Sequence, residues 1–283
     1  MSAAVPIAAA LTLLALVLFG VERWRPLRRP TAALLPRLAV NAAVSALAMV
    51  TAGLSVRPVA VGLLGWAQGE GWGLLRVARL PPALAWAAAI LLLDLSFYYW
   101  HRANHRLPLL WRFHGVHHVD PDLDVSTALR FHFGEVALSA AFRAVQVLII
   151  GPPAGAYLAY EAVFQANTLV HHSNVRLPLA LERALNALLV TPRMHGIHHS
   201  QVQAEAESNY SVVFAWWDRL HGSLRLGIRQ DDVVVGVPGY ARPADNRLGS
   251  LLAQPFRRPR DSWAGYAGPA RAPAGPGPGR LLE

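Results

Sequence analysis

The chain has 283 residues, of which 54% are hydrophobic and 15% charged, with no cysteine and a formal net charge of +9. This balance is too apolar for an average soluble domain and indicates an integral membrane protein. The lack of cysteine excludes disulfides, iron–sulfur clusters, cysteine-ligated zinc and thiol nucleophiles. The basic residues are all arginines, spread along the chain without a nucleic-acid-binding motif, so they predict cytoplasmic loops and no nucleic-acid partner.

The first apolar segment, residues 3–20, is long enough to cross a bilayer. A removable signal peptide is the competing interpretation, but no basic stretch precedes the apolar run. Instead, arginines crowd the segment 23–37 that follows it and predict a cytoplasmic loop. A second span is expected at 38–56, with a continuation past Arg57 left open. A third is expected at 80–100, which returns the chain to the cytoplasmic side.

The next apolar region, 136–170, is interrupted at Gly-Pro-Pro-Ala-Gly (151–155), where two prolines stop a helix. Each half has about 15 residues, or ~22 Å as helix, and is short of a ~30 Å hydrocarbon core. We therefore expect a helical hairpin that enters and leaves on one side, which brings His171 and His172 to the side of His101 and His118.

Two later segments are predicted from their composition. Residues 178–190 have the apolar spacing of an amphipathic helix that lies on the membrane surface. The sequence from Gln254 onward is rich in Pro, Gly, Ala and Arg and predicts a disordered tail.

Ten of the twelve histidines fall into four motifs: HRANH at 101–105, HGVHH at 114–118, HHSN at 171–174 and HGIHH at 195–199. In a helix, positions i and i+4 face nearly the same way, so two imidazoles can reach one metal ion. HxxHH offers a pair at i and i+3 and a neighbour turned by about 100°, which can reach a second ion. So many imidazoles beside a membrane require a compensating interaction. His132 and His221 stand alone, as ordinary hydrogen-bonded histidines do.

Nine or ten imidazoles are too many for one ion. Imidazole suits iron, zinc, copper and nickel. A single catalytic zinc takes about three protein ligands, and HExxH is absent. Haem takes one axial histidine from each of two facing helices. Two adjacent irons fit the number best, with imidazoles where soluble di-iron bundles have carboxylates. Zinc remains open as the metal, since it can replace iron during purification.

Six motifs between 94 and 223 resemble, in order, the fatty acid hydroxylase (sterol desaturase) superfamily of membrane non-haem di-iron oxygenases. They are DLSFYYWHRANH, HGVHH, LRFHFGE, HHSNVRLP, TPRMHGIHHS and SNYSVVFAWWDRLHGS. The resemblance implies these metal ligands: His101, His105, His114, His117, His118, His171, His172, His195, His198 and His199. Of these, His171 is the one that many relatives lack.

The resemblance also implies roles for residues around the ligands. Arg130, His132 and Glu135 form Arg-x-His-x-x-Glu and are expected to orient ligand imidazoles by bonding their other ring nitrogen. Asp94, costly inside a membrane helix, is expected to do the same. The closing motif is expected to pack near the site through Asn209, Trp217 and Asp218. It departs from the family pattern at three positions away from the ligands: Ser211, His221 and Ser223.

The activity that the resemblance implies is O2-dependent hydroxylation of a C–H bond in a lipid or sterol-like substrate. A desaturase with the same site is the alternative within this class. No nucleotide, flavin or haem motif occurs, so an external donor such as a ferredoxin or cytochrome b5-type protein is expected to supply the electrons. A non-catalytic metal-binding or metal-transporting membrane protein is the alternative from another class, and its ligands would lie near the membrane midplane.

Together these features predict an all-α integral membrane protein, with three transmembrane helices and a helical hairpin. A cytoplasmic, histidine-rich di-metal region is expected to cap it, in the inner membrane of a bacterium. The expected organisation is a transmembrane region at 1–80, a di-iron catalytic region at 81–228, and a C-terminal segment with the disordered tail at 229–283.

Overall fold

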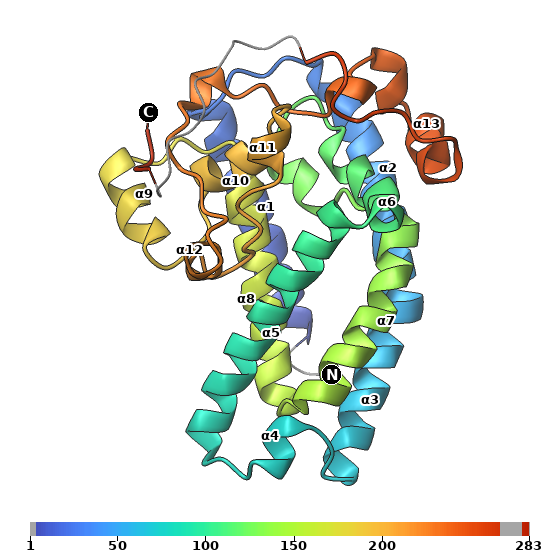
Figure 1. The fold of residues 1–283 in the computed structure, drawn as a ribbon, viewed down its shortest axis with the longest axis vertical. Coiled ribbons are helices and arrows are strands. Elements are labelled where there is room, and N and C mark those ends of the chain that lie inside the picture. Colours follow the sequence, from blue (N-terminus) through green and yellow to red (C-terminus); the bar gives the residue numbers. More distant parts are fainter. Residues whose placement is uncertain (1–3, 267–278, 283) are drawn as a thin grey trace.

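The computed structural model describes residues 4–266 and 279–282. These residues form helices, turns and three isolated β-bridges, with no strand among them, so the all-α prediction is confirmed. Figure 1 shows long helices side by side in the lower part and short helices and loops gathered at the upper end. We call the upper part the cap.

Four segments are long and apolar enough to cross a membrane. They are α1 (Ala4–Trp24), the run that begins with α2 (Leu34–Thr51), α5 (Pro82–Arg106) and α7 (Phe133–Ile150). The first three correspond to the predicted spans. The fourth, α7, is the first arm of the predicted hairpin, and α8 (Ala154–His172) is the second. The arms have 18 and 19 residues, longer than predicted, because both continue past the apolar stretch into polar residues of the cap.

The second span continues past Arg57, as the sequence left open. A π-helical stretch (Ala52–Val56) joins α2 directly to α3 (Arg57–Gly69), and a short turn leads to α4 (Leu74–Val77). Pro58 stands in the first turn of α3. Proline has no N–H to donate and its ring collides with the carbonyl four residues earlier, and a wider π turn accommodates both effects without ending the helix.

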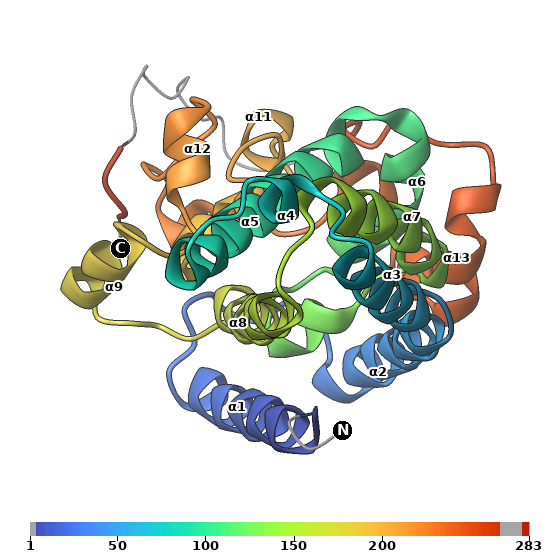
Figure 2. The ribbon, with the colours of Figure 1, turned by 90° about the horizontal axis from the view of Figure 1, so that it is seen from below.

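The bundle core lies between α5, α7 and α8. Leu93 and Phe97 of α5 pack on Val147 of α7 and Tyr160 of α8. Figure 2 shows α1 at the edge of the bundle beside α8, and α2 and α3 beside α7. The two hairpin arms thus form the centre on which the other spans pack.

The cap is built from short helices and loops. Its elements are α6 (Pro108–His118), η2 (Val125–Leu129), α9 (Leu179–Asn186), α10 (Pro192–His198), α11 (Gln203–Ala206), α12 (Trp216–Leu220), η3 (Gln230–Asp232), η4 (Pro238–Tyr240), η5 (Pro243–Asn246), α13 (Leu248–Ala253) and η6 (Gln254–Phe256). On α9, which lies in the predicted surface helix, Leu181 and Leu185 are exposed. Buried Arg37 of α2 ties the loop after α6 to the bundle through Asp120 (2.6 Å) and Asp124 (2.7 Å).

Residues 254–266, where the sequence predicted a tail without structure, are folded against α6. Ser262 accepts hydrogen bonds from the Trp111 indole and the Gly239 amide, both at 2.9 Å. Trp263 also stacks on Trp111, and this contact helps to hold the polar segment 254–266 against α6. The rest of the predicted tail, 267–278 and 283, lies outside the described residues. The domain boundaries near residues 80 and 228 stay predictions.

Candidate metal centre

Four helices carry a histidine in their last turn, at the cap end of the bundle. α5 carries His105 in its last turn, α6 His118, α8 His172 and α10 His198. Pro108 and Pro192, at the first turns of α6 and α10, have the fixed φ that starts a helix. Helix C-termini carry partial negative charge, so four of them ending together favour bound cations.

Nine histidines lie in two groups whose ligand nitrogens are all within 4.8 Å of one another. The five-histidine group is His101, His105, His114, His118 and His198, and the four-histidine group is His117, His172, His195 and His199. Two groups, each of the size that holds one ion, are what the sequence predicted for a two-metal site.

The two HxxHH motifs divide between the groups in opposite ways. His114 and His118 enter the five-histidine group and His117 the other, whereas His195 and His199 enter the four-histidine group and His198 the other. The two histidines of each motif that lie in one group are therefore i and i+4, not the i and i+3 that the sequence predicted. At about 100° per residue, position i+4 is turned by only ~40° from position i, whereas i+3 is turned by ~60° the other way.

Five of the nine imidazoles are oriented by a hydrogen bond from Nδ1–H to an oxygen. The pairs are His101 with the Tyr210 carbonyl (2.8 Å), His114 with Glu135 (2.9 Å), His117 with the Arg130 carbonyl (3.3 Å), His172 with the Thr168 carbonyl (2.8 Å) and His198 with the Ser208 carbonyl (2.7 Å). Because Nδ1 carries the proton in each, Nε2 presents a lone pair.

In the four-histidine group these lone pairs face one another. Nε2 of His117 lies 3.0 Å from Nε2 of His172, and neither nitrogen has a proton to share. The Nε2 atoms of His172 and His195 are also 3.0 Å apart, and those of His195 and His199 3.1 Å. Two acceptors as close as those of His117 and His172 repel unless a cation lies between them. The residues present therefore fit a metal ion.

The five-histidine group leads to the same conclusion. The Nε2 atoms of four of its members are buried without a hydrogen-bond partner: His105, His114, His118 and His198. Buried polar atoms almost always have a partner, so four orphans in one group require a ligand. All the atoms in both groups that could bind a metal are imidazole nitrogens, which suit iron, zinc, copper or nickel.

Burial keeps the histidines of the cap neutral. It lowers the pKa of His117, His118, His195 and His199 well below the usual value, with nearby histidines adding to the effect. It lowers the pKa of His198 to about 3. At neutral pH the imidazoles are therefore deprotonated, the form that binds metal.

Two of the residues expected to orient ligands contact them. Glu135 accepts the bond from His114 with its side chain, and Arg130 accepts the bond from His117 with its backbone carbonyl. The buried Arg130 guanidinium donates instead to Asn41 and Asn246, both at 2.6 Å, and so joins α2 to the cap.

His132 belongs to neither group. Its Nδ1 accepts from the Gly134 amide (2.9 Å), which caps α7, and its Nε2–H donates to the Leu252 carbonyl (3.2 Å). His171 is also outside both groups, and its Nδ1 accepts a bond from Asn167 (3.3 Å). Of the ten ligands predicted, the structure thus gathers nine.

Asp94 contacts no ligand imidazole, contrary to expectation. It accepts hydrogen bonds from Tyr160 (2.9 Å), the Phe214 amide (3.0 Å) and the Trp217 indole (2.8 Å). Seven residues of helix, about 10 Å, separate it from His101, too far for a direct bond. Its role is to join α5, α8 and the closing motif.

The closing motif packs beside the site, as predicted. Both carboxylate oxygens of buried Asp218 accept backbone bonds at 2.8 Å, from Tyr210 and Ser211. Asn209 has φ 55 and donates to the Met194 carbonyl (2.9 Å). These bonds fix the Tyr210 carbonyl that orients His101.

The sequence did not reveal the carbonyl acceptors, because any residue supplies a carbonyl. It also did not reveal Trp111, whose ring lies 5.0 Å from His105 and 5.5 Å from His118. The spacing of Trp111 and His114, three residues apart on one helix, was the available signal. Arg28 was missed too. It is buried against Gly196 between the histidines of α10, and donates to Gln230 at 2.6 Å.

The central glycines of the two HxxHH motifs should respond differently to alanine. At Gly196 a Cβ would collide with Nη1 of Arg28 and lie 2.9 Å from Oε1 of Gln230. At Gly115 the nearest atom would be 3.5 Å away, an ordinary contact. We expect Gly196→Ala to destabilise the protein by about 1–3 kcal/mol through overpacking. Gly115→Ala is expected to stay within about 0.5 kcal/mol.

Thermal unfolding of the two variants in the same detergent measures this difference. If both variants lose the same amount of unfolding temperature, or if neither loses any, the close contact between Gly196 and Arg28 is contradicted.

Comparison with known proteins agrees with this geometry. Residues 86–223 match the family model for fatty acid hydroxylase. The chain is 32% identical over 178 residues to an ornithine lipid hydroxylase of Rhizobium tropici, covering 63% of this chain and 52% of that protein. It is 29% identical over 169 residues to human alkylglycerol monooxygenase (59% and 36%), and 27% identical over 139 residues to human cholesterol 25-hydroxylase (48% and 49%).

The chain thus spans about half of these relatives or less, and no solved structure matches it. The matched region nevertheless contains all nine grouped histidines together with Glu135 and Asp218. Residues 86–223 thus match the fatty acid hydroxylase family, and the relatives named for lipid and sterol hydroxylation support the same superfamily.

Proposed function

We propose that the chain hydroxylates a C–H bond of a membrane lipid with O2, at two iron ions held by the nine grouped histidines. The observation that carries the proposal is the close approach of four Nε2 atoms in the four-histidine group, of which those of His117 and His172 are both acceptors. Iron, when bound, would supply the activation of O2, which imidazole and the other side chains here do not provide.

The chain's own residues then hold and shield the reaction. Nδ1 bonds to carbonyls and to Glu135 fix the rings, so the ligand nitrogens need no reorganisation during turnover. Burial of seven of the nine grouped histidines from water protects reactive species from side reactions. His114, His117 and His118 are each at most 2% exposed.

A lipid substrate is supported by the membrane-crossing helices and by the relatives. The bundle beneath the histidines is apolar, with Phe97, Phe142 and Phe164 packed one turn or more below His101. The relatives are named for ornithine lipid, alkylglycerol and cholesterol. Hydroxylation is favoured over desaturation because all three names describe hydroxylases or monooxygenases.

We place the cap on the cytoplasmic side of a bacterial inner membrane, on the strength of the arginines between α1 and α2. There an external one-electron carrier can reach it. A metal transporter would need ligands along a path near the membrane midplane, and both groups lie at the ends of the helices instead.

Mass spectrometry of lipids tests the proposal. Cells that express the chain and grow under isotopically labelled O2 should accumulate a lipid with one labelled oxygen, absent from cells that express His172→Gln. A lipid that has lost two hydrogens would indicate the desaturase. Identical lipids in both cultures, with the wild-type protein present and iron-loaded, would contradict catalysis.

A further inference from the structure

Two stacked indoles connect the five-histidine group to the surface of the cap. The Trp111 ring lies 5.0 Å from the His105 ring and 5.5 Å from the His118 ring. Trp263 stacks on the outer side of Trp111, at 5.7 Å between centroids and 25° between planes. Both indoles are half-buried. Electron transfer weakens steeply with distance, so rings in contact provide a short route between the site and the surface.

Specific hydrogen bonds hold the segment that carries Trp263. The Trp111 indole donates to Ser262 Oγ, and the Ser262 carbonyl accepts from the Gly239 amide, both at 2.9 Å. The Arg260 guanidinium binds Asp245 at 2.6 Å and lies over the Tyr240 ring at 4.1 Å. The position of Trp263 is therefore fixed by the fold around it.

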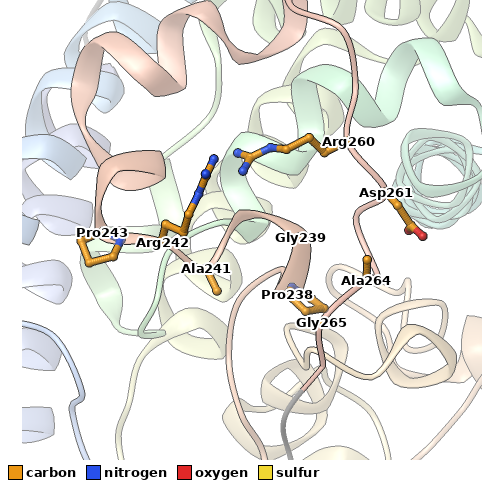
Figure 3. A pocket seen from close by; sticks show the side chains of 9 residues that line it. All are labelled: Pro238, Gly239, Ala241, Arg242, Pro243, Arg260, Asp261, Ala264 and Gly265. Carbon is orange, nitrogen blue, oxygen red and sulfur yellow. The ribbon is translucent and has the colours of Figure 1, made fainter.

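The surface around Trp263 is basic. Arg242 and Arg260 line a hollow beside this segment, and Arg257 and Arg258 are exposed in the stretch of chain that leads to Trp263; together with Trp263 we call these four arginines the arginine surface. Figure 3 shows Arg242 and Arg260 extending from opposite sides of a hollow of about 660 Å³. Its one acidic lining residue is Asp261. A second hollow, of about 130 Å³, places Arg112 and Arg260 beside Trp111.

We infer that the arginine surface is the docking site of an acidic one-electron carrier protein, and that Trp263 and Trp111 form the electron route to the five-histidine group. The inference rests on the proposed function, which requires reducing equivalents that no group in this chain supplies. Complementary charge steers the carrier and fixes its orientation. The stacked indoles then bring its redox centre into electronic contact with the ligand imidazoles.

The electron balance sets what the surface must deliver. Hydroxylation consumes one O2, two electrons and two protons, and yields the hydroxylated lipid and one water. A one-electron carrier is oxidised at each visit, so two docking events are needed per turnover. A surface that releases its partner readily suits this cycle, and salt-sensitive pairing of exposed charges has that property.

The test uses full-length, iron-loaded protein and reduced plant-type ferredoxin, an acidic protein, as the probe. Anaerobic stopped-flow absorbance follows ferredoxin oxidation. We expect Arg257→Glu/Arg258→Glu to slow it about tenfold at low salt, and to flatten the salt dependence seen in the wild type. The matched control is Arg29→Glu/Arg229→Glu, which reverses two exposed arginines outside the arginine surface and is expected to keep the wild-type rate.

The indole route is tested in the same assay. Trp263→Leu should slow ferredoxin oxidation, whereas Trp263→Phe keeps an aromatic ring and should restore most of the rate. Reduced methyl viologen, a small cation that does not need the surface, should reduce all variants as fast as the wild type.

The inference is overturned if ferredoxin oxidation is unchanged in Arg257→Glu/Arg258→Glu, or if the viologen reaction slows equally, which would show damage to the site itself. Failure of the proposed function has a different signature. Iron that accepts electrons from both reductants, in cells whose lipids gain no oxygen, would contradict hydroxylation while the ferredoxin comparison still decides the docking surface.

Discussion

Replacing His172 with glutamine is expected to release the ion of the four-histidine group, whereas the same change at the adjacent His171 leaves both ions bound. The two side chains are consecutive and equally buried, but only His172 directs Nε2 at His117 and His195. Glutamine keeps much of the volume and polarity of histidine, so the comparison isolates the ligand nitrogen. Mutation of a residue that only supports a ligand lowers metal affinity or activity by about 10–100-fold. Loss of a ligand itself should therefore lower the activity by more than this.

Metal content per chain after dialysis, and product formation in expressing cells, measure the two effects. His172→Gln should lose one of the two metals and its product, and His171→Gln should keep both. Equal loss in the two variants would contradict the assignment of His171 outside the groups.

Glu135→Gln is expected to weaken metal binding in the five-histidine group by about 10–100-fold. The Glu135 carboxylate accepts the Nδ1–H of His114 at 2.9 Å and makes that imidazole a stronger donor to a metal. The amide retains the shape and loses the charge. Competition with a chelator, followed by metal analysis, gives the change in affinity.

Glu207→Gln is the matched control. Glu207 is close to the site in the sequence, but it pairs with Arg106 at the surface and bonds no ligand histidine. It should leave the affinity unchanged. An equal decrease in both variants would mean that overall charge, and not the bond to His114, sets the affinity.

The sequence predicted those parts of the molecule that follow from chemistry at fixed spacing. Apolar length predicted the spans, and the two prolines at 152–153 predicted the hairpin that returns His172 to the cap. Helical periodicity predicted shared faces for the histidines. In contrast, the assignment of His117 and His198 to opposite groups depends on how α6 and α10 cross, and spacing within one helix carries no such information.

Other features could not be predicted because tertiary contacts override local composition. Residues 257–263 have the composition of a disordered segment, yet Trp263 and Ser262 each find a partner in Trp111. Asp94 resembled a residue that orients ligands because a carboxylate inside a membrane helix needs a partner. It has three partners, and they lie in the closing motif and α8.

Metal analysis of detergent-purified protein from iron-supplemented cells tests the central claim most directly. Two separate groups of buried imidazoles predict about two irons per chain, and about one in His172→Gln. Protein that is folded but contains no bound metal, in the wild type and the variant alike, would contradict the two-metal centre and with it the proposed hydroxylation.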